Sequence, residues 1–328
     1  MHKNTKIEVI SFVAMLCVVW WHCYCGSSIE RWFIPGFCVW SVPWFFFLSG
    51  VLFRKTIDSK PYSVVIRSKI RSLLMPYIIW CCIGAIITST IPFRVSMFDG
   101  ALDIFCISSK KIHPWGNNAL WYVRSLLIFM LLTVPIDYIN KKLLGNRRYF
   151  TMIFLLALVL LISHYFVSLG PSSSGFYFVV GMALSEMILG YKAGNIRNSF
   201  FVASCLIAVA VLLRLIWFCI GYDFINNGGT ILANMSVCFL MAGLWYLADL
   251  IPERFLKFSV IHQFLPLTAF VYFMHYPIND WIKYTARSFN SECLFVTLVV
   301  CAPIAYLSLA WSIKKYVSRI YSVLSGGR

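Results

Sequence analysis

The chain has 328 residues, of which 60% are hydrophobic and only 12% are charged. Soluble domains carry about 25% charged residues, so this composition excludes a soluble enzyme on a membrane anchor and indicates an all-α, polytopic membrane protein. Lysine and arginine total 28 against 12 acidic residues, which gives a net charge of +16. In a membrane protein such an excess belongs to the cytoplasmic loops, and we therefore expect no nucleic-acid partner.

Hydrophobic windows predict about ten transmembrane helices in a single membrane domain over residues 1–328. We interpret the first span as retained, because the residues before it (MHKNTK) are too few and too polar for a cleaved signal peptide. No polar stretch is long enough to form a separate extracytoplasmic domain. The expected spans are residues 7–25, 36–53, 73–91, 118–139, 149–169, 175–191, 199–221, 228–250, 265–282 and 293–313.

The connections between these spans alternate in charge. One side holds most of the basic residues, among them Lys3, Lys6, Arg54–Arg71 and the tail from Lys314. Basic residues concentrate on the cytoplasmic side, so we expect both termini in the cytoplasm of a multi-pass protein of the inner or plasma membrane. The long connection over residues 92–118 is then expected outside.

His22 lies near the end of the first apolar run, Ile7–Gly26. Ionisable side chains within a membrane usually face a bundle interior or a cavity. Imidazole exchanges protons near neutral pH, which makes His22 a candidate general base. The alternative is a histidine at the headgroup boundary, beside aromatic residues such as Trp21 and Tyr24. A metal site is not expected, because Cys25 shares a helical face with His22 but no second His/Cys pair is near.

Two further ionisable residues are expected at the depth of His22. Arg124 lies just inside the outer end of span four, and His275 lies in the outer half of span nine. Three polar residues from distant spans at one depth predict a site in the outer half of the bundle. The alternatives are that Arg124 only reaches to the surface and that His275 serves the backbone near Pro277, which must free a carbonyl one turn back.

The cytoplasmic connection Arg54–Arg71 is strongly basic. Arg67 and Arg71 are four residues apart and share one helical face, whereas Lys69 lies off that face. Paired guanidinium groups suit a phosphate-bearing ligand, although a lipid-headgroup or topogenic cluster explains them equally. Neither GxxxxGK[ST] nor GxGxxG occurs, so we expect no nucleoside triphosphate site and no dinucleotide fold.

The cysteines and the remaining buried charges give less information. The chain has 12 cysteines without a CxxC pair, and most are interpreted as small hydrophobic core residues. A disulfide among Cys23, Cys25 and Cys38 stays open. Glu186 and Arg214 are lone charges at other depths, to which we assign no role.

Five segments occur in a recognisable order. They are VVWWH ending at His22, VPWFFFLSGVLFRK (Val42–Lys55), IRSKIRSLLMPYIIW (Ile66–Trp80), ALWYVRSLLIF (Ala119–Phe129) and FVYFMHYPI (Phe270–Ile278). In this order the chain resembles the integral-membrane acyltransferase family 3 over nearly its whole length. Members of that family add acyl groups, most often acetyl, to sugars of extracytoplasmic glycans and related molecules.

The resemblance implies that acetyl-CoA, or another acyl-CoA, is the acyl donor and approaches from the cytoplasm. Its phosphates would be held by Arg67 and Arg71, with Lys69 in support. No metal is implied. The implied partners are the lipid bilayer, an extracytoplasmic glycan or sugar acceptor, and a separate extracytoplasmic protein in place of the esterase-like domain that some relatives carry.

The resemblance also implies the catalytic groups. The histidine of the family's first span maps onto His22, which as a neutral imidazole would deprotonate the acceptor hydroxyl. Arg124 and His275 would orient the substrates or stabilise the thioester oxyanion.

One position departs from the family pattern. The family usually has Arg or Lys eleven residues before the histidine, and Ser11 stands there, whereas Glu8 keeps an acidic residue just before it. Lys6 is close in sequence but is expected to point elsewhere and to lie shallower. Three functions therefore stay open: an acyltransferase, a transporter or flippase for a glycan or lipid precursor, and a catalytically inactive relative.

Overall fold

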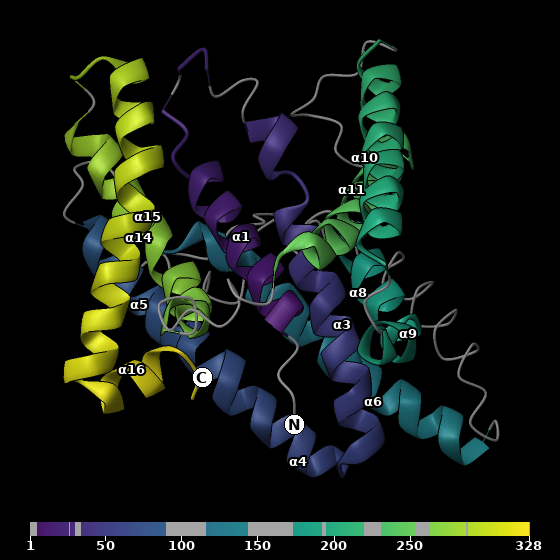
Figure 1. The fold of residues 1–328 in the computed structure, drawn as a ribbon. Coiled ribbons are helices and arrows are strands. Elements are labelled where there is room, and N and C mark those ends of the chain that lie inside the picture. The colour runs from purple at the N-terminus through teal and green to yellow at the C-terminus, as the bar shows by residue number, and fades with distance from the viewer. Residues whose placement is uncertain are drawn as a thin grey trace.

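The structure, a computed structural model, describes residues 5–25, 27–29, 34–89, 116–143, 173–191, 195–219, 231–252, 263–286 and 288–327. All secondary structure within these ranges is helical (Figure 1). The predicted all-α class is therefore confirmed for the part of the chain that is described.

The helices follow one another in this order: α1 (Thr5–Trp21), η1 (Ile34–Cys38), α3 (Ser41–Ser59), α4 (Tyr62–Lys69), η2 (Ile70–Leu74), α5 (Met75–Ser89), η4 (Asn118–Leu120), α6 (Trp121–Leu143), α8 (Ser173–Ala183), α9 (Ser185–Gly190), α10 (Ile196–Cys219), α11 (Ile231–Leu247), η6 (Ala248–Leu250), η7 (Leu265–Leu267), α14 (Thr268–Thr285), α15 (Ser291–Tyr316) and α16 (Ser318–Leu324).

Within the residues that the structure describes, six helical stretches are long and apolar enough to cross a membrane, and each overlaps one of the ten predicted spans. They are Gly36–Ser59, Tyr62–Ser89, Asn118–Lys142, Ile196–Trp217, Ile231–Leu250 and Ser291–Tyr316.

Three of the other four predicted spans differ from this pattern, and the fourth is not among the described residues. The first is α1, which has 17 residues. The expected span 175–191 is divided at Leu184 into α8 and α9. The expected span 265–282 is α14, whose hydropathy is lowered by polar residues such as Asn279 and Lys283. The expected span 149–169 lies outside the described residues.

Close packing of α3 against α8 depends on small residues. A Cβ atom at Gly50 would lie 2.0 Å from the carbonyl oxygen of Phe178, and one at Gly181 would lie 2.0 Å from that of Phe47. Small residues let membrane helices approach until their backbones touch. These two glycines therefore fix the distance between α3 and α8.

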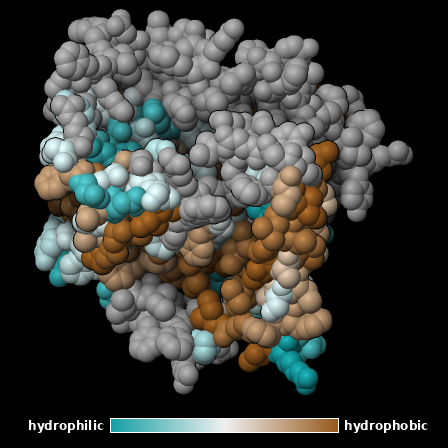
Figure 2. Space-filling view, turned by 90° about the horizontal axis from the view of Figure 1, so that it is seen from above, coloured by the Kyte–Doolittle hydropathy of each residue, from teal (hydrophilic) through white to brown (hydrophobic). Residues whose placement is uncertain are grey.

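Hydrophobic side chains cover one side of the molecule. Seen from above, they gather on the right, the side on which Figure 1 places α10 and α11 (Figure 2). Phe201 of α10 is 68% exposed and Leu215 is 56% exposed. An apolar exposed face of this kind is stable when lipid chains cover it.

Two ends of the molecule can be distinguished in Figure 1. α4 and α16 lie at the lower end, whereas the C-terminal end of α1 and the turn between α14 and α15 lie at the upper end. We use the terms upper end and lower end in this sense below.

Candidate functional site

His22 lies in the turn that follows α1, because the helix ends at Trp21. Its backbone amide still donates to the carbonyl oxygens of Val18 at 3.3 Å and Val19 at 3.1 Å. The predicted span 7–25 is therefore four residues too long at its end, because apolar residues continue past the point where the helix stops. The residue has a partly exposed position at the upper end, rather than one inside a helix.

His275 is fully buried in α14. Its Nδ1 lies 2.7 Å from the carbonyl oxygen of Tyr272. A carbonyl oxygen can only accept, so in the neutral ring Nδ1 carries the proton and Nε2 carries a lone pair. Nε2 is buried and has no hydrogen-bond partner among the described residues. An unmatched buried acceptor costs free energy, so it marks a position where a substrate or a proton can be received.

The structure brings His22 and His275 together, although 253 positions separate them in the sequence. Their ring centroids are 5.1 Å apart, with the ring planes inclined at 45°. The ring of Tyr276 also contacts His22, with the ring centroids 4.9 Å apart in an edge-on arrangement. Two titratable rings thus share one small volume at the upper end.

Asn279 holds the end of α1 against α14. Its amide nitrogen donates to the carbonyl oxygen of Val19 at 3.5 Å and lies 3.8 Å from the sulfur of Cys23. The Asn279 side-chain oxygen accepts a hydrogen bond from the hydroxyl of Tyr306 on α15. The carbonyl of Val19 also accepts from the amide of His22, so the contact with Asn279 ties the turn that carries His22 to α14.

Two asparagines before α6 hold the histidine turn of α14. Pro277 has no amide hydrogen, which leaves the carbonyl of Phe273 without its usual helical donor. The side chain of Asn117 donates to that carbonyl at 2.8 Å. Asn118 donates to the hydroxyl of Tyr276, also at 2.8 Å. The freed carbonyl predicted from Pro277 is thus served by Asn117 and not by His275.

Gly116 places these asparagines. Its φ of +76° is in the left-handed region, and a Cβ atom there would lie 2.4 Å from the carbonyl oxygen of Cys81 on α5. A Cβ atom at Gly84 would lie 2.2 Å from the carbonyl oxygen of Gly116. Only glycine suits this conformation and this close approach, so the start of α6 is set directly on α5.

Arg124 lies in the first turns of α6 and is 4% exposed. Two residues earlier, the ring of Tyr122 contacts the ring of Tyr272, with centroids 5.6 Å apart. The start of α6 therefore packs on the turn of α14 that contains His275. The structure places Arg124 in the interior of the bundle rather than at its surface.

The basic residues Arg67, Lys69 and Arg71 lie at the lower end, on α4 and η2. Arg67 and Arg71 are exposed, whereas Lys69 is half-buried with its nitrogen 5.7 Å from the ring centroid of Phe53. The two guanidinium groups are therefore accessible, and Lys69 packs against α3.

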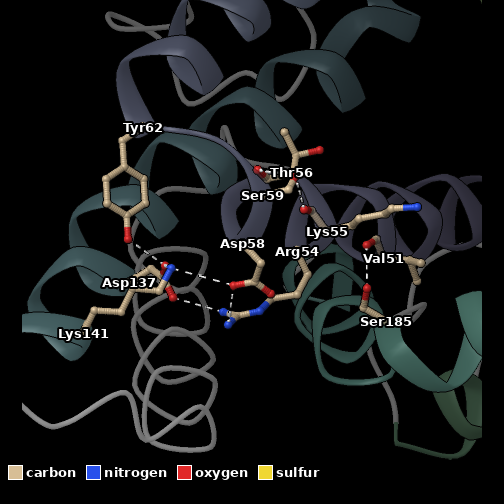
Figure 3. A network of polar contacts seen from close by, with 10 residues as sticks. All are labelled: Val51, Arg54, Lys55, Thr56, Asp58, Ser59, Tyr62, Asp137, Lys141 and Ser185. Carbon is tan, nitrogen blue, oxygen red and sulfur yellow. Dashed lines mark hydrogen bonds and ion pairs between the residues drawn. The ribbon is translucent and has the colours of Figure 1, made fainter.

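Sequence reasoning missed a buried ion network at the lower end (Figure 3). Arg54 was expected in a loop, but α3 continues to Ser59 and Arg54 is 4% exposed. It donates to the carboxylate of Asp137, which is fully buried, at 3.0 Å. Tyr62 donates to the same carboxylate at 2.9 Å, and Lys141 lies 2.7 Å from it. Asp58 adds a second contact to Arg54 at 2.9 Å.

Lys6 and Ser11 both have partners within the bundle. The Lys6 ammonium lies 2.6 Å from the carboxylate of Asp249 and 4.0 Å from the ring centroid of Trp245. The hydroxyl of Ser11 accepts a hydrogen bond from the indole of Trp44 at 3.1 Å. Lys6 therefore does not stand in for the basic residue that is expected at position 11.

A cleft of about 340 Å³ opens at the upper end, between the turn after α1 and the ends of α14 and α15 that face it. Tyr24 follows His22 by two residues and Asp280 follows His275 by five, but neither histidine is among the residues that line the cleft. Its lining combines aromatic and charged side chains, among them Tyr24, Asp280, Lys283, Tyr284 and Phe289.

Cysteines and acidic residues do not add a metal centre to this region. Cys23, Cys25 and Cys38 are not joined in disulfides, and the thiol of Cys25 donates to the carbonyl of Ser291 at 3.2 Å. In the part of the chain that the structure describes, no three His, Cys, Asp or Glu residues are grouped closely enough to hold a metal ion.

The histidine pair, the buried arginine and the apolar helices can now be compared with known proteins. A family model described as an acyltransferase domain, Acyl_transf_3, matches residues 4–314. The chain belongs to this acyltransferase family. No curated protein and no solved structure matches the chain.

The protein is thus a membrane acyltransferase, and all of the site residues predicted from its sequence fall within the matched range. The supporting residues of this acyltransferase that sequence reasoning missed are Asn117, Asn118, Tyr276 and Asn279. In the sequence, the asparagines are indicated by two polar pairs, Asn117-Asn118 in GNNALWY and Asn279-Asp280 after HYPI. Both pairs are unusual beside apolar spans, where uncompensated polar groups are costly.

Proposed function

We propose that this acyltransferase moves an acyl group, most simply acetyl, from cytoplasmic acyl-CoA to a hydroxyl of an extracytoplasmic sugar or envelope glycan. The observation that carries the proposal is the ring contact between His22 and His275. In this proposal the upper end of Figure 1 faces outward and the lower end faces the cytoplasm.

His22 is the general base of the proposed reaction. It takes the proton of the acceptor hydroxyl as that oxygen attacks the thioester carbonyl, so that a carbon–oxygen bond forms. The carbon–sulfur bond breaks, and His22 returns the proton to the departing thiolate. His275, with its Nδ1 proton held by Tyr272, keeps a lone pair on Nε2 in the same volume. That lone pair stabilises the imidazolium that forms on His22.

Arg124 is proposed to stabilise the negative charge that develops on the thioester oxygen. A fixed cation in a site shielded from water is worth far more than the same cation in bulk water. The burial of Arg124 at the start of α6 supports this assignment.

The acyl donor fits the lower end, where its phosphates would bind Arg67 and Arg71. Both guanidinium groups are exposed, and planar guanidinium groups bind phosphate through two parallel hydrogen bonds. Lys69 supports them from its position over Phe53. The donor contributes an activated thioester carbonyl. Lys6 is paired with Asp249, and Ser11 accepts from Trp44. Arg67 and Arg71 are therefore the basic groups proposed to bind the donor.

The test of the proposed reaction is mass spectrometry of surface glycan from cells that lack the gene and carry either the wild type or His22→Ala. We expect acyl esters on the glycan with the wild type and none with His22→Ala at equal protein level. Trp21→Ala, a change in the same segment, is the matched control and should retain the esters. Unchanged acylation in cells without the gene would overturn the proposal in favour of a transporter or an inactive relative.

Donor binding is tested separately with purified protein and coenzyme A. Ligand binding to the folded state raises the midpoint of thermal unfolding. We expect coenzyme A to raise it for the wild type and to raise it much less for Arg67→Ala combined with Arg71→Ala. Lys60→Ala, an exposed basic residue of the same connection, should behave as the wild type. An equal shift for all three proteins would exclude the arginines from the donor site.

A further inference from the structure

The C-terminal helix α16 runs across the lower end of α15 (Figure 1). At about 1.5 Å per residue, the 26 residues of α15 span about 39 Å. This length exceeds the roughly 30 Å of the hydrocarbon core of a bilayer, so the end of α15 reaches the lipid headgroups. Because α15 ends at Tyr316 and α16 begins at Ser318, α16 lies at the depth of these headgroups.

One side of α16 is fixed to the bundle. The ring of Tyr321 stacks on that of Phe270 of α14, with the centroids 5.1 Å apart and the planes inclined at 16°. The Tyr321 hydroxyl donates to the carbonyl of Pro266 at 3.1 Å. The indole of Trp80 on α5 donates to the carbonyl of Leu324 at 2.9 Å. These contacts leave the other side of α16 directed away from the protein.

The side of α16 that is directed away carries apolar side chains. Ile320 is 53% exposed and Val323 is 55% exposed. These two residues are three positions apart and therefore share one helical face. Tyr316, at the end of α15, is 72% exposed. An exposed apolar face on a helix that lies at headgroup depth is stable when it enters the boundary between headgroups and acyl chains.

Basic side chains accompany this apolar face. Lys314 and Lys315 lie in the last turn of α15, and Arg319 lies in the first turn of α16. Lys315 and Arg319 are exposed. Between Glu292 and Arg328 the sequence has no acidic residue, so this segment is purely cationic. Cationic segments next to the end of a membrane helix attract anionic lipids.

We propose that α16 and the end of α15 form a binding site for anionic phospholipid at the lower end of the molecule. Ile320 and Val323 enter the boundary between headgroups and acyl chains. Lys314, Lys315 and Arg319 bind the lipid phosphate, and the net negative charge of the lipid favours it over a zwitterionic one. This site is independent of the acyl-transfer reaction.

The test is a titration of the purified protein in detergent with phosphatidylglycerol, which is anionic, or with zwitterionic phosphatidylcholine. Lipid binding is followed by the midpoint of thermal unfolding. We expect phosphatidylglycerol to raise the midpoint at a lower mole fraction than phosphatidylcholine. Lys314→Gln, Lys315→Gln and Arg319→Gln are combined in one variant. This variant should need at least about tenfold more phosphatidylglycerol for half of the shift, since each basic residue near an anionic surface contributes about fivefold.

The matched control removes three exposed positive charges from elsewhere, by Lys55→Gln, Lys60→Gln and Arg197→Gln. It should titrate as the wild type does. Ile320→Ser combined with Val323→Ser should weaken the binding of both lipids, because both lose the same apolar contact. Equal titration of the wild type by the two lipids would overturn the proposal. So would an equal loss in the control, because the effect would then follow net charge alone.

Coenzyme A is the other source of phosphate groups at this end. If the variant of Lys314, Lys315 and Arg319 loses a shift that coenzyme A causes in the wild type, these residues bind the donor and the lipid site is overturned. A coenzyme A shift that the variant retains, together with a weakened response to phosphatidylglycerol, supports a separate site for lipid.

Discussion

The upper and lower ends of the molecule each contain a buried polar cluster, and the two clusters differ in how completely their groups are paired. At the lower end, both oxygens of Asp137 accept hydrogen bonds, and Arg54 bonds to two carboxylates. At the upper end, Nε2 of His275 has no hydrogen-bond partner within the described residues. Buried charge that is fully paired holds helices in place, whereas an unmatched acceptor leaves capacity for chemistry.

The difference suggests a division of roles along the membrane normal. The Asp137 cluster joins the ends of α3, α4 and α6, so its loss should affect folding. The histidine pair joins α1 and α14 through ring contact, so its loss should affect turnover. The following variants test this division, from the largest expected effect to the smallest.

The largest effect is expected for His22→Ala. Loss of a general base lowers the transfer rate by about 10²–10⁴-fold. The midpoint of thermal unfolding should change little, because His22 lies in a turn and is partly exposed. Rate and unfolding are measured on the same purified sample. A large fall in the unfolding midpoint would mean that the histidine pair is structural, and the comparison between the two ends would then fail.

The second largest effect, a loss of stability, is expected for Asp137→Ala at the lower end. Removing this carboxylate leaves Arg54 buried with one partner fewer, which costs about 3–5 kcal/mol of unfolding free energy. The turnover of the protein that still folds should stay near that of the wild type.

Asp58→Ala is the matched control for Asp137→Ala. Asp58 is 33% exposed in its side chain, so its removal should cost no more than about 1 kcal/mol. Denaturant or thermal unfolding in detergent compares the two variants. Equal losses would show that burial of the pair does not matter.

A smaller effect is expected for Gly116→Ala, a variant that should lower both stability and turnover. The new Cβ atom would meet backbone atoms of α5, and the alanine would have to adopt the left-handed φ that glycine has at this position. This strain amounts to about 1–3 kcal/mol. Because Asn117 and Asn118 follow directly, the histidine turn of α14 loses support and turnover should fall with stability. Gly190→Ala, where a Cβ atom meets nothing within 4 Å, should change neither.

The smallest effect is expected for Asn279→Ala. The hydroxyl of Tyr306 loses its acceptor, and the carbonyl of Val19 loses one of its donors but keeps the amide of His22, which together cost about 1–2 kcal/mol. The turn that carries His22 becomes less firmly held, so we expect the transfer rate to fall by less than in His22→Ala. Asn279→Asp retains the acceptor for Tyr306 and separates the two contacts. A transfer rate equal to that of the wild type in both variants would exclude Asn279 from positioning His22.

Hydropathy was sufficient to predict the helical class and the stretches such as Asn118–Lys142 and Ser291–Tyr316, because lipid requires long apolar helices there. It could not predict that α1 ends at Trp21, since Cys23 and Cys25 beyond it are as apolar as the helix itself. The turn after Trp21 is held by a tertiary contact with Asn279, which has no signal within residues 7–25.

The partners of buried polar groups were equally hidden in the sequence. Arg54 and Asp137 are 83 residues apart, and Arg54 was counted as a loop residue because it follows an apolar run. The need for a side-chain donor near Pro277 could have been anticipated, because a proline in a membrane helix frees a carbonyl that requires a donor from elsewhere. The sequence does not say which of its polar residues supplies that donor.

The clasp between Lys6 and Asp249 has a consequence for biosynthesis. These residues are 243 positions apart, so α1 is synthesised long before the residue that anchors its first turn. During that time α1 must stay in the membrane through its apolar residues and its packing against nearby helices such as α3. His275 and Asn279 follow Asp249 in the chain and emerge later still. The helix α1 therefore reaches its final position long after its own synthesis, and His22 meets its partners later than Lys6 does.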